Sequence, residues 1–273
     1  MAAPTFEVLI ASVDRVPTPE ELPYGGALEF PPAPRPYVVV NFVASIDGVA
    51  SLGVTDGTDS TKLGGSSQAD RYLMALLRAQ ADVIMIGAGN IRATPGHQWI
   101  PTAVAGDQTA LIESYRVALH GVAEPPPLVI VSGSGNLPAH VALDAPATST
   151  AVVTTERGAG RVRKAHPLVS ALVVEGNGEM DGAAVIKAVT DAFGAGVMLC
   201  EGGPSLFGRL LASRSVQELF LTVSPQIAGR QHNEARPGIV SDWAADPDAL
   251  RAATLVSLRR SEDHLFLRYS LET

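Results

Sequence analysis

A carboxylate followed by two glycines stands at the end of an apolar run, and it is the strongest chemical signal in the chain. The run is Val197–Glu201, and Gly202, Gly203 and Pro204 follow it. Proline suits the first turn of a helix, and the free N–H groups at a helix start bind anions such as a pyrophosphate. A plain strand-to-helix turn is the alternative, but loops at strand ends carry function in α/β proteins. We therefore expect Glu201 and this turn to face a ligand.

A second glycine turn follows the apolar run Asp82–Gly87. Glycines let a ligand approach the backbone closely, and free N–H groups at such a turn hold phosphate. The turn lacks the third glycine of the G-x-G-x-x-G motif and the lysine of a phosphate-binding loop. A turn that packs against the next element explains the pattern equally well. The candidate cofactor-binding residues here are Gly87, Gly89, Asn90, Ile91 and Arg92.

The basic residues of this acidic chain gather after the apolar run Ala151–Thr155. The hydroxyls of Thr154 and Thr155, with the arginines that follow, could hold a phosphate, because guanidinium groups match its geometry. A 2′-phosphate at this place would select the phosphorylated nicotinamide cofactor. A solvated basic helix face is the alternative interpretation.

Polar side chains also interrupt the apolar run that begins at Tyr37. Asn41, Ser45 and Asp47 share one face of a strand by its period of two, and buried polar groups need partners. We expect them to face a ligand, although Asp47 and the next glycine would also serve as a turn. Arg78 ends an amphipathic helix, where neutralising the helix C-terminus is the simpler interpretation and binding a phosphate or carboxylate the other.

These residues must be positioned by alternating strands and helices. Repeated strand, loop and helix units indicate an α/β fold with a central, mostly parallel sheet flanked by helices, and the final pair of strands indicates an antiparallel C-terminal hairpin. The expected helices are Gln68–Gln80, Ala110–Leu119, Asp181–Phe193 and Pro204–Ala212. The expected strands are Tyr37–Ala44, Asp82–Gly87, Pro127–Ser132, Ala151–Thr155, Ala171–Glu175, Val197–Glu201, Glu218–Ser224, Ala253–Arg260 and His264–Ser270.

A proline-rich segment precedes this body. The prolines between Val16 and Pro36 exclude a helix or a central strand there. We expect an N-terminal arm of residues 1–35, with a short strand at Phe6–Ile10, followed by a single domain of residues 36–273.

Composition excludes several classes of function. A net charge of −8 argues against a nucleic-acid partner. The single Cys200 excludes an intramolecular disulfide and a multi-cysteine zinc site, and the scattered histidines lack metal-ligand spacing, so no metal is expected. No apolar run approaches the ~18 residues of a membrane span, and the start of the chain lacks the basic region of a signal peptide. We expect a soluble, cytoplasmic protein without a membrane partner.

Five segments follow one another from about Pro36 onward: PYVVVNFVASIDG, LLRAQADVIMIGAGNIR, VVTTE, VMLCEGGPSLFGRLL and ELFLTVSPQIAG. Together they resemble the reductase domain of the bacterial bifunctional riboflavin-pathway deaminase–reductase, which has the dihydrofolate reductase-like fold. The cysteine signature of the zinc deaminase is absent. The chain therefore resembles a stand-alone reductase domain.

The resemblance implies NADPH as the cofactor and a small-molecule substrate, a phosphorylated aminopyrimidine whose ribosyl group is reduced to ribityl. The positions that would contact the cofactor are Ala44, Asn90, Thr94, Gly203, Pro204, Ser205 and Leu206. Those that would contact the substrate are Arg78 and Glu201, and Asn41 and Asp47 would line the same cleft. The resemblance also implies a homodimer.

The reduction needs a proton, from Asp47, Glu201 or an ordered water. Two alternatives stay open for the function. One is an NADPH-dependent reductase of another substrate, such as a dihydropterin. It stays open because the pair Asn90-Ile91, Thr94 and the segment Gly96–Trp99 depart from the family pattern. The other is a non-catalytic NADPH-binding protein.

Overall fold

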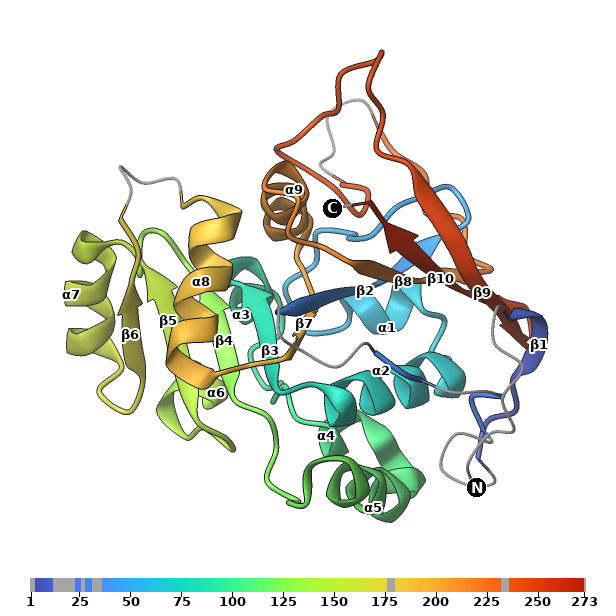
Figure 1. Cartoon of the computed structure of the whole chain (residues 1–273), viewed down its shortest axis with the longest axis horizontal. Coiled ribbons are helices and arrows are strands. Elements are labelled where there is room, and N and C mark those ends of the chain that lie inside the picture. The colour runs from blue at the N-terminus through green and yellow to red at the C-terminus, as the bar shows by residue number, and fades with distance from the viewer. Residues whose placement is uncertain are drawn as a thin grey trace.

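The computed structural model of the chain describes residues 3–11, 23–25, 28–30, 36–175, 180–231 and 236–272. Within these residues, one ten-stranded sheet runs through the molecule in the order β1-β9-β10-β8-β2-β7-β3-β4-β5-β6 (Figure 1). Its strands are β1 (Glu7–Ala11), β2 (Tyr37–Ser45), β3 (Val83–Gly87), β4 (Leu128–Val131), β5 (Thr150–Thr154), β6 (Ser170–Val173), β7 (Val197–Cys200), β8 (Glu218–Ser224), β9 (Ala253–Ser261) and β10 (His264–Leu271).

Strand direction divides the sheet into two parts. From β8 through to β6, every neighbouring pair is parallel. At the β8 end, β10, β9 and β1 continue the sheet in antiparallel pairing, and β9 and β10 form the C-terminal hairpin. The α/β class, the mostly parallel sheet and the antiparallel hairpin that the sequence predicts are confirmed.

Helices cover both faces of the sheet (Figure 1). One face packs its side chains, such as Val39 and Ile84, against α2 and α5, and the other packs Val40 and Met85 against α8 and α9. This division follows from the alternation of side chains along each strand. The helices are α1 (Asp59–Leu63), α2 (Gln68–Gln80), α3 (Ala88–Ala93), α4 (Thr102–Ala105), η1 (Gly106–Gln108), α5 (Thr109–His120), α6 (Val141–Asp144), α7 (Glu156–Ala165), α8 (Gly182–Phe193) and α9 (Pro204–Ala212).

The N-terminal segment joins this body through β1, which lies one residue later than the predicted strand Phe6–Ile10. Phe6, Tyr24 and Leu28 are buried in the core on the α2 side. Pro17, Pro19, Pro31, Pro32 and Pro34 of the predicted arm lie outside the described residues. The division at residue 35 therefore stays a prediction.

None of the helices in the described part of the chain has the length and apolar character needed to cross a lipid bilayer.

Candidate active site

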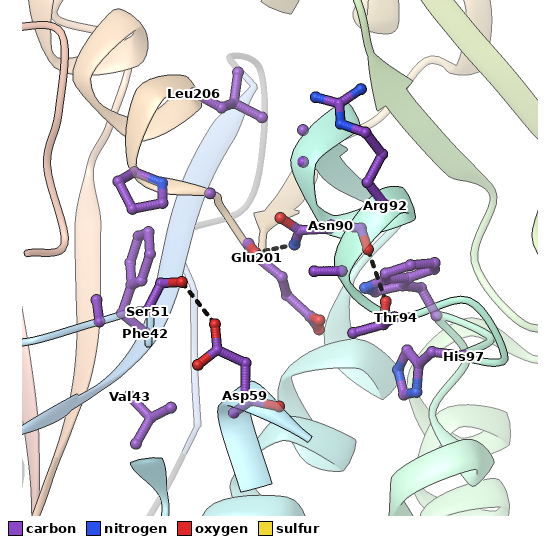
Figure 2. A pocket seen from close by; sticks show the side chains of 18 of the residues that line it. Phe42, Val43, Ser51, Asp59, Asn90, Arg92, Thr94, His97, Glu201 and Leu206 are labelled. Atoms are coloured by element: carbon purple, nitrogen blue, oxygen red, sulfur yellow. Dashed lines mark hydrogen bonds between the residues drawn. The ribbon is translucent and has the colours of Figure 1, made fainter. Parts of the chain in front are cut away.

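A cavity of about 990 Å³ opens at the carboxyl ends of β2, β7, β3 and β4. This is the edge of a parallel sheet where ligands bind, and the volume is near the upper end of the ~300–1,000 Å³ usual for ligand pockets. Its walls come from β2, α1, the start of α2, α3, residues 94–99 and the start of α9. Figure 2 shows the Glu201 side chain between Asp59 on one wall and Asn90 and Thr94 on the other.

A buried ion pair stands at the centre of this cavity. Arg78 donates from Nε to Glu201 Oε1 and from Nη2 to Glu201 Oε2, each at 2.7 Å. The Arg78 side chain is 1% exposed and that of Glu201 is 9% exposed. Arg78 Nη1 also donates to the carbonyl of Ile100 at 3.0 Å. Bidentate pairing gives both charge compensation and a fixed geometry, so α2 and the end of β7 together aim Glu201 into the cavity.

His97 completes the partners of Arg78. Its Nε2 lies 3.0 Å from Arg78 Nη2, and because a guanidinium only donates hydrogen bonds, Nε2 is the acceptor. Burial, with the guanidinium charge beside it, lowers the pKa of His97 to about 4. The imidazole is therefore neutral at physiological pH. The edge-on contact with Trp99, at 5.0 Å between ring centroids, holds the ring in place.

The two glycine turns predicted from the sequence meet beside Glu201. The Gly87 N–H donates to the carbonyl of Gly202 at 2.6 Å, and Asn90 Nδ2 donates to the carbonyl of Glu201 at 2.9 Å. A Cβ added to Gly87 would stand 3.3 Å from the backbone nitrogen of Gly203. Both turns therefore need a bare backbone at their contact.

This contact leaves a cradle that fits an anionic cofactor group. Gly203 is the N-cap of α9 and Pro204 begins the helix, and within the described part of the chain no side chain caps its first N–H groups. Uncapped amides at a helix start bind phosphate. Pro204, Ser205 and Leu206 line the cavity from this side. In Figure 2, Arg92 extends away from Thr94 and His97, at the end of the cavity where Leu206 lies.

A third loop reaches the cavity after β4. Its residues Ser132, Gly133 and Ser134 line the cavity. They were not predicted as site residues, although they follow an apolar run as the other turns do. Thr155 donates to the carbonyl of Gly133 at 2.9 Å, and Arg161 donates to the carbonyl of Ser134 at 2.8 Å. The predicted basic cluster thus supports this loop from behind.

The structure places six of the predicted site residues away from the cavity lining, although each lies in or next to a segment that forms it. These residues are Ala44, Asp47, Ile91, Thr154, Thr155 and Gly202. The other predicted residues all line the cavity: Asn41, Arg78, Gly87, Gly89, Asn90, Arg92, Thr94, Glu201, Gly203, Pro204, Ser205 and Leu206. These predicted residues therefore come together from four separate stretches of the chain.

Asp47 has partners of its own outside the cavity. Its carboxylate accepts hydrogen bonds from the Ser45 hydroxyl at 2.6 Å, the Gly229 N–H at 2.8 Å and the Ala228 N–H at 3.1 Å. These hydrogen bonds, that of Ser45 first, lower the pKa of Asp47 to about 2. This exposed carboxylate ties the loop after β8 to the end of β2.

Three further carboxyl groups line the cavity and were not predicted from the sequence: Asp56, Asp59 and Asp70. Asp59 accepts from the Ser51 hydroxyl at 2.6 Å and from the Leu52 N–H at 2.7 Å. Asp70, in the first turn of α2, is 8% exposed, and burial raises its pKa. An acidic residue in a first helical turn is ordinary in sequence, so nothing in the pattern marks Asp70.

A family model described as the RibD C-terminal domain matches residues 36–244. No curated protein matches the chain significantly. A deaminase/reductase from Thermotoga maritima has a similar structure, with a TM-score of 0.63 at 15% identity, over 87% of this chain and 57% of that chain. The chain thus spans a little over half the length of that protein.

Two shorter proteins are similar along most of their length. A pyrimidine reductase-like protein from Corynebacterium diphtheriae has a TM-score of 0.65 at 23% identity, over 87% of this chain and 92% of that chain. The riboflavin biosynthesis reductase Rib7 of Saccharomyces cerevisiae has a TM-score of 0.56 at 16% identity, over 89% of this chain and 93% of that chain. At these identities the likeness concerns the fold.

Proposed function

Because the chain belongs to the family of RibD C-terminal domains, we propose that it is an NADPH-dependent reductase of the riboflavin-pathway type. Its substrate would be a 5-amino-6-ribosylaminopyrimidinedione 5′-phosphate, whose ribosyl group is reduced to ribityl. The observation that carries this proposal is the meeting of two bare-backbone turns beside Glu201, in a cavity of about 990 Å³ at the carboxyl edge of the parallel sheet. Such a cavity has room for a cofactor and a substrate side by side.

The cofactor would lie along the β3, β4 and β7 side of the cavity. The N–H groups of Gly203 and Ser205, at the start of α9, would hold its pyrophosphate, because proline has no N–H and the Leu206 N–H already donates to the Gly203 carbonyl. The loop Ser132–Ser134 would hold the 2′-phosphate, and Arg161 would keep that loop in place through its hydrogen bond to the Ser134 carbonyl. Asn90 keeps the two turns together through its bond to the Glu201 carbonyl. When bound, NADPH supplies the hydride.

The substrate would occupy the side of the cavity that faces β2 and α2. Arg78 holds the Glu201 carboxylate in one geometry, and a carboxylate in that position can orient the hydroxyl or amino groups of a sugar and a ring. Fixing two reactants in one orientation and excluding water account for much of the rate of such a reaction. Arg71 adds a cation to this wall that can attract a phosphate.

The proposal is tested by mixing the purified protein with NADPH and the pyrimidine phosphate and following NADPH absorbance in a single turnover. Oxidation of NADPH with formation of the ribityl product is expected. Oxidation with a dihydropterin but not with the pyrimidine would overturn the substrate. Tight NADPH binding with no hydride transfer to any candidate would overturn the assignment as an enzyme. A homodimer and a cytoplasmic location stay predictions, the first to be measured by light scattering.

A further inference from the structure

Hydride reduction leaves an electron pair on the atom beside the reduced carbon, and a group in the cavity must give that atom a proton. Four carboxyl groups of the described chain line the cavity: Asp56, Asp59, Asp70 and Glu201. Their surroundings differ enough to separate their roles, because pairs of titratable groups with different environments divide acid and base work between them.

Three of the four carboxyl groups are held as acceptors. Glu201 receives two N–H groups from a buried guanidinium, and Asp59 receives a hydroxyl and a backbone N–H. Asp56 is exposed, and hydrogen bonds from Thr58 lower its pKa to about 2. Each of these three groups therefore already accepts hydrogen bonds from donors of the chain.

Asp70 is in the opposite situation. Burial raises its pKa, and the negative charge of Glu201 acts in the same direction. The groups that oppose this are the Thr222 hydroxyl on β8, His264 on β10 and Arg71 on its own helix, and they do not offset the burial. Asp70 is therefore the cavity carboxyl group that its surroundings favour as a neutral acid.

An unsatisfied amide oxygen on the same side of the sheet points to a ligand there. Asn41 is 9% exposed and lines the cavity, and its buried Oδ1 has no hydrogen-bond partner among the described residues. Asn41 follows Val39 by two residues along β2, so both face the α2 side of the sheet, where Asp70 lies. A buried acceptor without a partner is costly, and an N–H group of a bound ring would satisfy it.

We infer that Asp70 is the catalytic acid of this site and that Asn41 Oδ1 accepts a hydrogen bond from an N–H of the substrate beside it. The inference rests on the proposed function, because the ring-opened ribosylamine offers a C=N bond. A hydride adds to the carbon of that bond, forming C–H, and the π electron pair moves to the nitrogen. The Asp70 proton forms the new N–H bond, and the carboxylate then recovers a proton from water.

The test compares Asp70→Asn with Asp191→Asn, an exposed carboxylate on α8 that pairs with Lys187 away from the cavity. Both variants are measured for NADPH affinity, thermal unfolding and single-turnover oxidation of bound NADPH as a function of pH. We expect Asp70→Asn to bind NADPH as the wild type does but to transfer hydride about 10²–10⁴-fold more slowly, the usual contribution of a general acid. The wild-type rate should fall as Asp70 loses its proton, and that pH dependence should disappear in Asp70→Asn.

A second measurement does not depend on turnover. Carbon-13 NMR of aspartate carboxyl groups in the NADPH-loaded protein should contain one resonance that titrates well above the usual ~3.9 and is missing in Asp70→Asn. An ordinary titration of this resonance, or a folded Asp70→Asn that keeps the wild-type rate and pH profile, would overturn the inference. If the wild type transfers hydride to no candidate, the proposed function fails, and the titration alone then decides whether Asp70 is a poised acid.

Discussion

Removing Arg78 should expose how strongly the centre of the site depends on its ion pair. Arg78→Met keeps much of the aliphatic volume but leaves the Glu201 carboxylate, 9% exposed, without its two guanidinium hydrogen bonds. Taking one partner from a buried pair costs about 3–5 kcal/mol because the remaining charge is uncompensated. We expect the free energy of unfolding to fall by about that amount, measured by urea unfolding at a fixed protein concentration.

The double variant separates the charge from the packing. Glu201→Gln alone leaves the guanidinium of Arg78 buried and only partly paired, so it should also destabilise the protein. Arg78→Met combined with Glu201→Gln removes both charges, and its loss should be clearly smaller than the sum of the two single losses. A loss below about 1 kcal/mol for Arg78→Met, in the range of an exposed pair, or strict additivity in the double variant, would refute this reasoning.

Three further outcomes are expected. Gly87→Ala should weaken NADPH binding at least tenfold in a fluorescence titration, because the new methyl would stand 3.3 Å from the backbone nitrogen of Gly203. The control is Gly160→Ala in α7, whose Cβ would meet open space and which should bind NADPH normally. Arg161→Ala should raise the Kd for NADPH about tenfold but not that for NADH, because it removes the charge-assisted hydrogen bond, of about 1.5–3 kcal/mol, that holds the Ser134 carbonyl. Equal losses for the matched surface variant Arg163→Ala would contradict this local effect. The pKa of His97 is about 4 in the folded protein and ~6.5 in the unfolded chain. Between these pH values the unfolded chain binds more protons than the folded protein. The free energy of unfolding should therefore fall by up to about 3 kcal/mol as the pH drops from 6.5 to 4. Thermal unfolding of His97→Gln should lose that part of the pH dependence, and an unchanged profile would contradict it.

The frame of the fold could be predicted because its elements carry strong periodic signals. The helices Gln68–Gln80 and Pro204–Ala212 occur with the bounds that the sequence predicts, and so does the strand Glu218–Ser224. Their apolar spacing and their glycine or proline boundaries are local properties. The short helix α3 was not predicted, because the turn Gly87–Arg92 has two glycines and its helical form depends on the contact with the β7 turn.

The site was predictable where it consists of backbone turns and not where it consists of side-chain partners. The two glycine turns were singled out from residue types alone, and the structure brings them together. The partnership of Arg78 with Glu201 joins residues 123 positions apart, and the resemblance, not the spacing, suggested that they share a site. His97 and Asp70 had no signal at all, since their chemistry comes from burial and from charges supplied by distant elements.

Titration of the purified protein with NADPH and, separately, with NADH, followed by nicotinamide fluorescence, tests the proposed cofactor. The loop Ser132–Ser134, held in place by Arg161, should bind the 2′-phosphate, so NADPH should bind at least about tenfold more tightly than NADH. Equal affinities would remove the 2′-phosphate site. Binding of neither nucleotide would mean that the turns at Gly87 and Gly203 serve only to pack the sheet, and the assignment as a reductase would fail with them.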